Sequence, residues 1–250
     1  MGLGKSIKNL QRESTPESNI AVKVSQFVGN AAGLEKTLRL LQSIFQVVGA
    51  NLLPAAAAPW LRARAQFALG RRYLRFLKFI DAFSLAFETL SSRSGVVAFL
   101  EFGKWSCLGM FLLLESCTIL YAMGVYRTSW ASWLFVEAVK FWFYSLCFGI
   151  LRAIYELWNL SWAGTSHSTE AEGGSGKVAG RVALDEDSGR RQRTLQRQIA
   201  MKKLVIEGCD LFTPGAVTGW LVVSSGNVGM LCLVSTVFAG ADVWDEILGT

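Results

Sequence analysis

Apolar and polar positions follow the period of an α-helix along most of this chain, and proline and glycine divide the pattern into long segments. No segment shows the every-second-residue alternation, closed by an Asn-Gly or Asp-Gly turn, that is typical of a β-hairpin. A break at residues 30–33 separates the first long helical segment from the second. We therefore predict an all-α protein.

The segment after this break carries a stripe of large apolar side chains on one helical face. Such a stripe usually packs in a core or against a partner helix. Pro54 and Pro59 are predicted to end this helix, because proline lacks the backbone N–H that a helix interior requires. We take the stripe as a candidate surface for self-association, formed by Leu34, Leu38, Leu41 and Phe45.

The next segment, from Trp60 to Ile80, mixes six basic residues with aromatic and aliphatic ones. At about 100° per residue, most basic side chains fall on one side of a helix and the large apolar ones on the other. Because an Arg or Lys at the bilayer centre costs about 2.5 to 3.5 kcal/mol, we expect this helix to lie flat in the interface. The alternative is a helix packed in an ordinary bundle with a solvated basic side. The predicted membrane-binding residues are Trp60, Arg64, Phe67, Arg71, Arg72, Leu74, Arg75, Phe76, Lys78 and Phe79.

Three later segments are apolar enough to enter a membrane. Residues 216–240 contain no charged residue and are the strongest candidate for a transmembrane helix. Residues 96–126 are the second candidate, with Glu115 inside the apolar run. Residues 130–162 are rich in aromatic side chains, but their longest uncharged part, 141–151, is too short to cross alone, so we expect a buried or interfacial helix there, with a membrane crossing as the alternative. The sequence thus predicts an integral membrane protein with about two transmembrane helices.

These segments divide the chain into four parts. Residues 1–95 form an amphipathic helical region in the cytosol or at the interface, and residues 96–162 form membrane-embedded helices. Residues 163–190 are rich in Gly, Ser, Thr and acidic residues, the composition of a flexible linker. Residues 191–250 combine a basic helix with the C-terminal transmembrane helix.

Composition agrees with a membrane environment, since 52% of the residues are hydrophobic, including nine Trp and sixteen Phe. Residues 1–95 carry a net charge of +8 against +6 for the whole chain, so we expect anionic lipids, and not nucleic acid, as the partner. Five unclustered cysteines and a single histidine, His167, provide no metal site and no catalytic constellation. We predict neither enzymatic activity nor a cofactor, and a membrane enzyme is the weakest alternative.

Two stretches resemble a known family. GLEKTLRLLQSIFQ at 33–46, followed by RRYLRFLKF at 71–79, is similar to the N-terminal region of the peroxin-11 family of peroxisomal membrane proteins. A basic helix that ends in CDLF at 209–212, a late uncharged span and Trp244 fit the same family, and the aromatic block and the linker resemble its divergent fungal members.

The resemblance implies a multi-pass protein of the peroxisomal membrane that promotes elongation of the organelle before fission. It also implies self-association, both termini in the cytosol, and cooperation with dynamin-related fission machinery. The alternative is a pore or carrier for small metabolites, suggested by charged residues within the apolar segments. These residues are Glu115, Glu137, Lys140 and Arg152.

Overall fold

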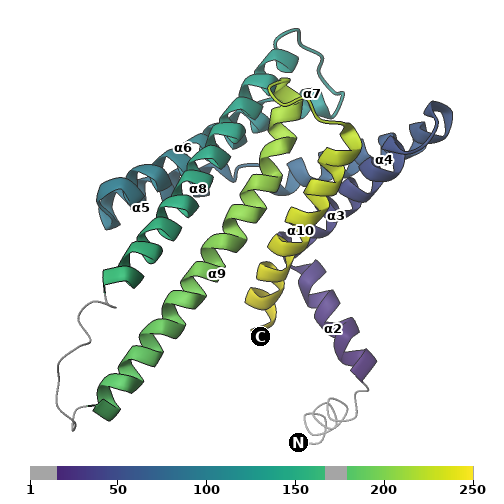
Figure 1. Cartoon of the computed structure of the whole chain (residues 1–250). Helices are drawn as coiled ribbons and strands as arrows, with labels where there is room; N and C mark the ends of the chain where they lie inside the picture. Colours follow the sequence, from purple (N-terminus) through teal and green to yellow (C-terminus); the bar gives the residue numbers. More distant parts are fainter. Residues whose placement is uncertain (1–15, 167–178, 250) are drawn as a thin grey trace, which may run out of the picture.

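The structure, a computed structural model, describes residues 16–166 and 179–249 (Figure 1). The described residues form helices and no strand, which confirms the all-α prediction. The helices are α2 (Pro16–Gly29), α3 (Ala31–Ala50), α4 (Pro54–Arg75), α5 (Phe79–Ser92), α6 (Gly95–Cys117), α7 (Ile119–Ala122), α8 (Ala131–Ser166), α9 (Ala179–Thr218) and α10 (Ser225–Leu248).

The long helices pack as a series of neighbours whose order differs from the chain order. α4 packs on α3, α3 on α10, α10 on α9, α9 on α8, α8 on α6, and α6 on α5. The C-terminal half of the chain therefore lies between α3 and α6 (Figure 1). A buried apolar cluster, formed by Ala82, Phe111, Leu112 and Ala138, joins α5, α6 and α8.

Three helices among the described residues are long and apolar enough to cross a membrane: Gly95–Cys117, Ala131–Trp162 and Ser225–Leu248. The first and the last correspond to the two predicted transmembrane helices. The aromatic block adds a third, because it forms one continuous helix instead of stopping at its charged residues. Those charges are spaced along α8 and form ion pairs, as between Lys140 and Glu137, so they do not interrupt the helix.

The prediction that Pro54 and Pro59 end the second helix is wrong. α3 ends at Ala50, and Pro54 is the first residue of α4, where its missing N–H costs no intrahelical hydrogen bond. Pro59 lies inside α4. The prolines therefore belong to the start of the next helix.

Two other boundaries also differ from the prediction. The uncharged run 216–240 is not one helix, because α9 continues to Thr218 and α10 begins at Ser225, so the candidate span is shifted to Ser225–Leu248. The Ser224 side chain caps α10, because its Oγ accepts a hydrogen bond from the backbone N–H of Asn227 at 3.3 Å. Within the predicted linker, residues 163–166 and 179–190 are helical, and residues 167–178 lie outside the described residues.

The predicted break at residues 30–33 is confirmed. Asn30 caps α3, since its Oδ1 accepts a hydrogen bond from the Ala32 amide at 2.9 Å. At Gly33 the chain returns so close to α2 that a Cβ atom would overlap the carbonyl oxygen of Phe27. Glycine therefore permits the tight junction between these two helices. The Phe27 ring then reaches Trp244 of α10, with 5.4 Å between ring centroids.

Candidate functional site: the arginine helix and its buried partners

The segment predicted as one amphipathic helix from Trp60 to Ile80 is divided by an elbow. α4 ends at Arg75 and α5 begins at Phe79, so α4 carries five of the six basic residues, and we call it the arginine helix. Leu77 lies in the elbow with φ of 64°, a left-handed conformation that is unfavourable for a residue with a branched side chain. The elbow directs α5 away from the axis of α4 and along α6.

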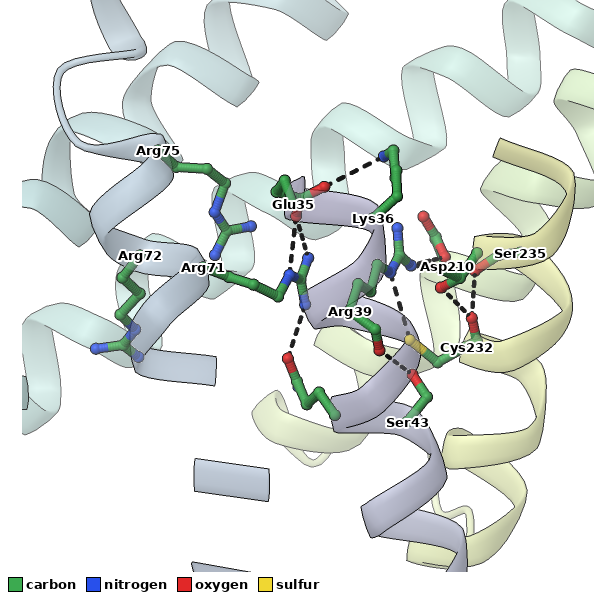
Figure 2. Close-up of polar contacts among 12 residues, drawn as sticks. Glu35, Lys36, Arg39, Ser43, Arg71, Arg72, Arg75, Asp210, Cys232 and Ser235 are labelled. Atoms are coloured by element: carbon green, nitrogen blue, oxygen red, sulfur yellow. Dashed lines mark hydrogen bonds and ion pairs between the residues drawn. The ribbon is translucent and has the colours of Figure 1, made fainter. Parts of the chain in front are cut away.

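The basic side of the arginine helix faces the protein, and Arg71 is its most buried member (Figure 2). Arg71 Nε donates a hydrogen bond to Glu35 Oε1 on α3 at 2.8 Å, and Nη1 donates to Gln42 Oε1 at 2.9 Å. Burial alone raises the pKa of Glu35, but the cations Arg71, Lys36 and Arg75 outweigh it and lower that pKa to about 2. The carboxylate is therefore ionised at neutral pH and holds α3 to α4.

Further along the arginine helix, Arg72 and Arg75 reach the acidic residue inside the first candidate span. Arg75 Nη2 lies 2.9 Å from Glu115 Oε1, and Arg72 Nε lies 3.5 Å from the same oxygen. The Arg72 guanidinium also lies 4.4 Å from the centroid of the Phe135 ring, a cation–π contact. Glu115 is thus neutralised by α4, and Arg75 links the arginine helix to the first candidate span.

A second buried ion pair, which the sequence analysis did not identify, joins α3 to α9. Arg39 pairs with Asp210, and both side chains are about nine-tenths buried. Arg39 Nη2 also donates to Ser235 Oγ at 3.1 Å, and its Nε contacts Cys232 Sγ at 3.4 Å (Figure 2). At about 100° per residue Arg39 lies outside the leucine stripe, so the acid within the CDLF motif was the signal that the sequence offered.

The remaining predicted membrane-binding residues divide by exposure. Trp60, Phe76 and Lys78 are exposed, whereas the side chains at positions 67, 74 and 79 are half-buried. Neither sequence alternative described this orientation, because both placed the basic side of the helix outward. Four arginines of α4 are paired with acids and amides on α3 and α6 instead: Arg64, Arg71, Arg72 and Arg75. Burial of these charges without such partners would cost more free energy. Membrane contact by the ten residues stays a prediction.

The apolar stripe of α3 finds a partner within the same chain. The Phe45 ring lies 5.6 Å from Trp60 and 5.3 Å from Phe67, measured between centroids. Leu38 lies against Gly70, where an added Cβ would meet its side chain at 3.6 Å. The four stripe residues are half-buried in this contact with α4, and self-association through them stays a prediction.

No group of His, Cys, Asp and Glu side chains in residues 16–166 and 179–249 could hold a metal ion. The five cysteines are free thiols, and they range from exposed Cys117 to buried Cys232. What the site does provide is a set of charged contacts that tie the arginine helix to the candidate spans.

A comparison with models of protein families identifies the family of this chain. The family model described as Peroxisomal biogenesis factor 11 matches residues 21–244, from α2 almost to the end of α10. The chain belongs to the peroxin-11 family. No curated protein and no solved structure gives a significant match.

Membership confirms the resemblance noted from the stretches at 33–46 and 71–79. A peroxin-11 protein is a peroxisomal membrane protein with a role in peroxisome biogenesis and proliferation, and the family is not known for enzymes. The three long apolar helices are consistent with insertion of this family member into a membrane.

Proposed function

We propose that this protein elongates the peroxisomal membrane before fission by inserting the α4–α5 elbow into the cytosolic leaflet. Side chains that enter one leaflet enlarge its area relative to the other, which favours positive curvature. The proposal includes self-association, which would concentrate these insertions, and cooperation with dynamin-related fission machinery. It rests on family membership and on one structural observation, the exposed apolar side chains at the elbow.

The elbow patch consists of four large apolar side chains within eight residues of sequence. Tyr73, Phe76, Leu77 and Ile80 are 46%, 47%, 48% and 54% exposed, respectively. Clustered exposed apolar side chains mark surfaces that meet a membrane or a protein. Because full burial of a large apolar side chain contributes about 1.5 to 3 kcal/mol, covering the exposed half of each would contribute about 1 kcal/mol.

Charge has a smaller part in this mechanism than the sequence suggested. Lys78 is exposed within the elbow and would contribute about 1 kcal/mol near an anionic surface. Arg64, Arg71 and Arg75 are engaged with protein groups and so contribute less to lipid binding. Insertion would therefore depend mainly on the apolar side chains, and anionic lipid would add to it.

We propose that both chain ends lie on the cytosolic side, with an even number of crossings between them. α6 and α9 run in one direction, and α8 and α10 run in the other (Figure 1). α9 packs against both α8 and α10, but it is not among the three helices that are long and apolar enough to cross a membrane. Crossing by two of these three helices, with the third in the interface, would bring the chain back to the side from which it entered.

The pore alternative receives no support from its own four residues. Glu115 pairs with Arg75, Glu137 pairs with Lys140, and Arg152 contacts both Glu101 and Glu156. Charges that are paired between and along helices are explained by packing. Solute flux through liposomes that contain the purified protein would favour the pore if it exceeded that of empty liposomes.

Substitution of Leu77 by glycine tests the proposal because it separates insertion from folding. Glycine accepts the left-handed conformation at position 77, so Leu77→Gly removes an apolar side chain and also relieves backbone strain of about 1 to 2 kcal/mol. We expect the variant Leu77→Gly with Phe76→Ser and Ile80→Ser to reach peroxisomes and to leave them short when overproduced. The measurement is peroxisome length in cells, with a fluorescent fusion beside a peroxisomal marker.

The matched control is Leu53→Ser, which removes a side chain that is 80% exposed at the opposite end of the same helix. The control should elongate peroxisomes as the unchanged protein does. Elongation by the elbow variant to the same length as the unchanged protein would remove the elbow from the mechanism.

A further inference from the structure

A pocket of about 270 Å³ lies where α3, α4, α9 and α10 meet, and Trp142 of α8 closes one side. Its lining is unusual for a helical bundle, because three arginines and two glutamines from α3 and α4 face the same space. They are Arg39, Gln42, Gln46, Arg64 and Arg71. Pockets for small ligands have a few convergent polar groups of this kind, and this volume is near their lower limit.

Positive charge exceeds negative charge in the lining of this pocket. Arg39 is paired with Asp210, and Arg71 is paired with Glu35. Arg64 has a neutral partner instead, since its Nε donates to Gln46 Oε1 at 3.0 Å. Within the described part of the chain, no carboxylate forms an ion pair with Arg64. The three arginines thus face two carboxylates, and one positive charge is left over.

The far side of the pocket adds further hydrogen-bond donors. Thr213 of α9 lines the pocket, and its buried hydroxyl oxygen has no hydrogen-bond partner among the described residues. A buried hydroxyl without a partner is costly, so a ligand oxygen that accepted a hydrogen bond from Thr213 would remove that cost. Ser225, the first residue of α10, also lines the pocket and places the positive end of that helix beside it.

We propose that this pocket binds one phosphate group, carried either by a phospholipid headgroup or by a soluble phosphate compound. The donors of Arg64, Thr213 and the start of α10 come from three different helices, so they approach from different sides, which suits a tetrahedral anion. Guanidinium groups form their strongest hydrogen bonds with phosphate and carboxylate oxygens. The bound anion would neutralise Arg64 and connect the arginine helix to α9 and α10. This inference does not depend on membrane elongation by the elbow.

Calorimetric titration of the full chain in neutral detergent tests the site with two probes, inorganic phosphate and dihexanoylphosphatidic acid. We expect Arg64→Gln to weaken binding by about tenfold or more, since a lost charge-assisted contact is worth at least about 1.4 kcal/mol. Arg62→Gln is the matched control, because Arg62 is exposed on the same helix, where its Nε donates a hydrogen bond to the Ala58 carbonyl at 3.4 Å. It should bind both probes as the unchanged protein does.

Thr213→Val provides a second variant of nearly the same shape, and it should weaken binding severalfold without loss of helical circular dichroism. Binding of both probes would show that a free phosphate suffices, and binding of phosphatidic acid alone would identify a lipid headgroup as the source. The proposal is overturned if neither probe binds the unchanged protein, or if both variants bind as tightly as it does. Neither result would bear on peroxisome length.

Discussion

Arg39 of α3 and Asp210 of α9 form a buried ion pair between positions that are 171 residues apart in the sequence. Burial alone lowers the pKa of Arg39, but Asp210 outweighs it and raises that pKa above its usual value. The pair therefore holds the N-terminal region against the long basic helix of the C-terminal half.

Removing one member of this pair should be strongly destabilising. Asp210→Asn leaves the Arg39 charge buried without its counterion, which typically costs about 3 to 5 kcal/mol. The control is Asp242→Asn, which breaks the pair with Lys202 at a position where the acid is 56% exposed and where about 0 to 1 kcal/mol is expected. Thermal unfolding in detergent, followed by circular dichroism at 222 nm, measures the difference. Equal losses in the two variants would contradict a structural role for the buried pair.

The contact between Arg75 and Glu115 predicts coupling between the arginine helix and α6. Glu115→Gln and Arg75→Gln should each destabilise the protein, because each removes one charge of an ion pair and leaves the other without this partner. The double variant should lose less stability than the sum of the two single variants, with an interaction energy of about 0.5 to 3 kcal/mol. A double-mutant cycle by thermal unfolding checks this, with exposed Lys78→Gln in place of Arg75→Gln as the control. Additive losses in the Arg75 cycle would argue against the contact.

The low pKa of Glu35 predicts that the stability of the folded protein decreases at acid pH. Its pKa is about 2 in the folded protein against an ordinary value of 4.5, so the folded state favours the ionised form. The stabilisation is therefore complete above about pH 4.5 and is lost as the pH falls toward 2. We expect the protection of amides in α3 and α4 from hydrogen exchange, relative to their intrinsic rates at each pH, to fall over this range in the unchanged protein and to fall less in Glu35→Gln. The Glu88→Gln variant, altered at an exposed position, should behave as the unchanged protein does.

Two glycines beside the α2–α3 junction predict opposite outcomes for the same substitution. Gly33→Ala would place a Cβ atom against the carbonyl oxygen of Phe27, so the junction must open and the contact between Phe27 and Trp244 should weaken. Gly29→Ala meets nothing within 4 Å and should leave stability unchanged or raise it by up to about 1 kcal/mol. Tryptophan fluorescence and thermal unfolding of the two variants provide the comparison. A stable Gly33→Ala protein with unchanged fluorescence would contradict the tight junction.

Local signals in the sequence identified the features that depend on nearby residues. The break at Asn30 was predictable because a capping side chain and a glycine act within a few residues of sequence. The first and last candidate spans were predictable because length and apolar composition are sufficient criteria. The continuity of the aromatic block was not predictable, since Lys140 and Arg152 bound its longest uncharged part, whereas in the folded chain Lys140 pairs with Glu137 and Arg152 pairs with Glu101 along one helix.

Helical periodicity by itself determined the all-α class and that Arg64, Arg71 and Arg75 share one side of α4, and the stretches at 33–46 and 71–79 indicated the family. It did not determine which way that side faces, because the period relates neighbours on one helix and contains no information about what packs against it. Only the tertiary structure brings Glu35, Glu115 and the amides of α3 to the arginines, and desolvation then favours pairing them inside the protein. The direction of the arginine helix, with its apolar elbow exposed and its charges inward, was decided by those distant partners.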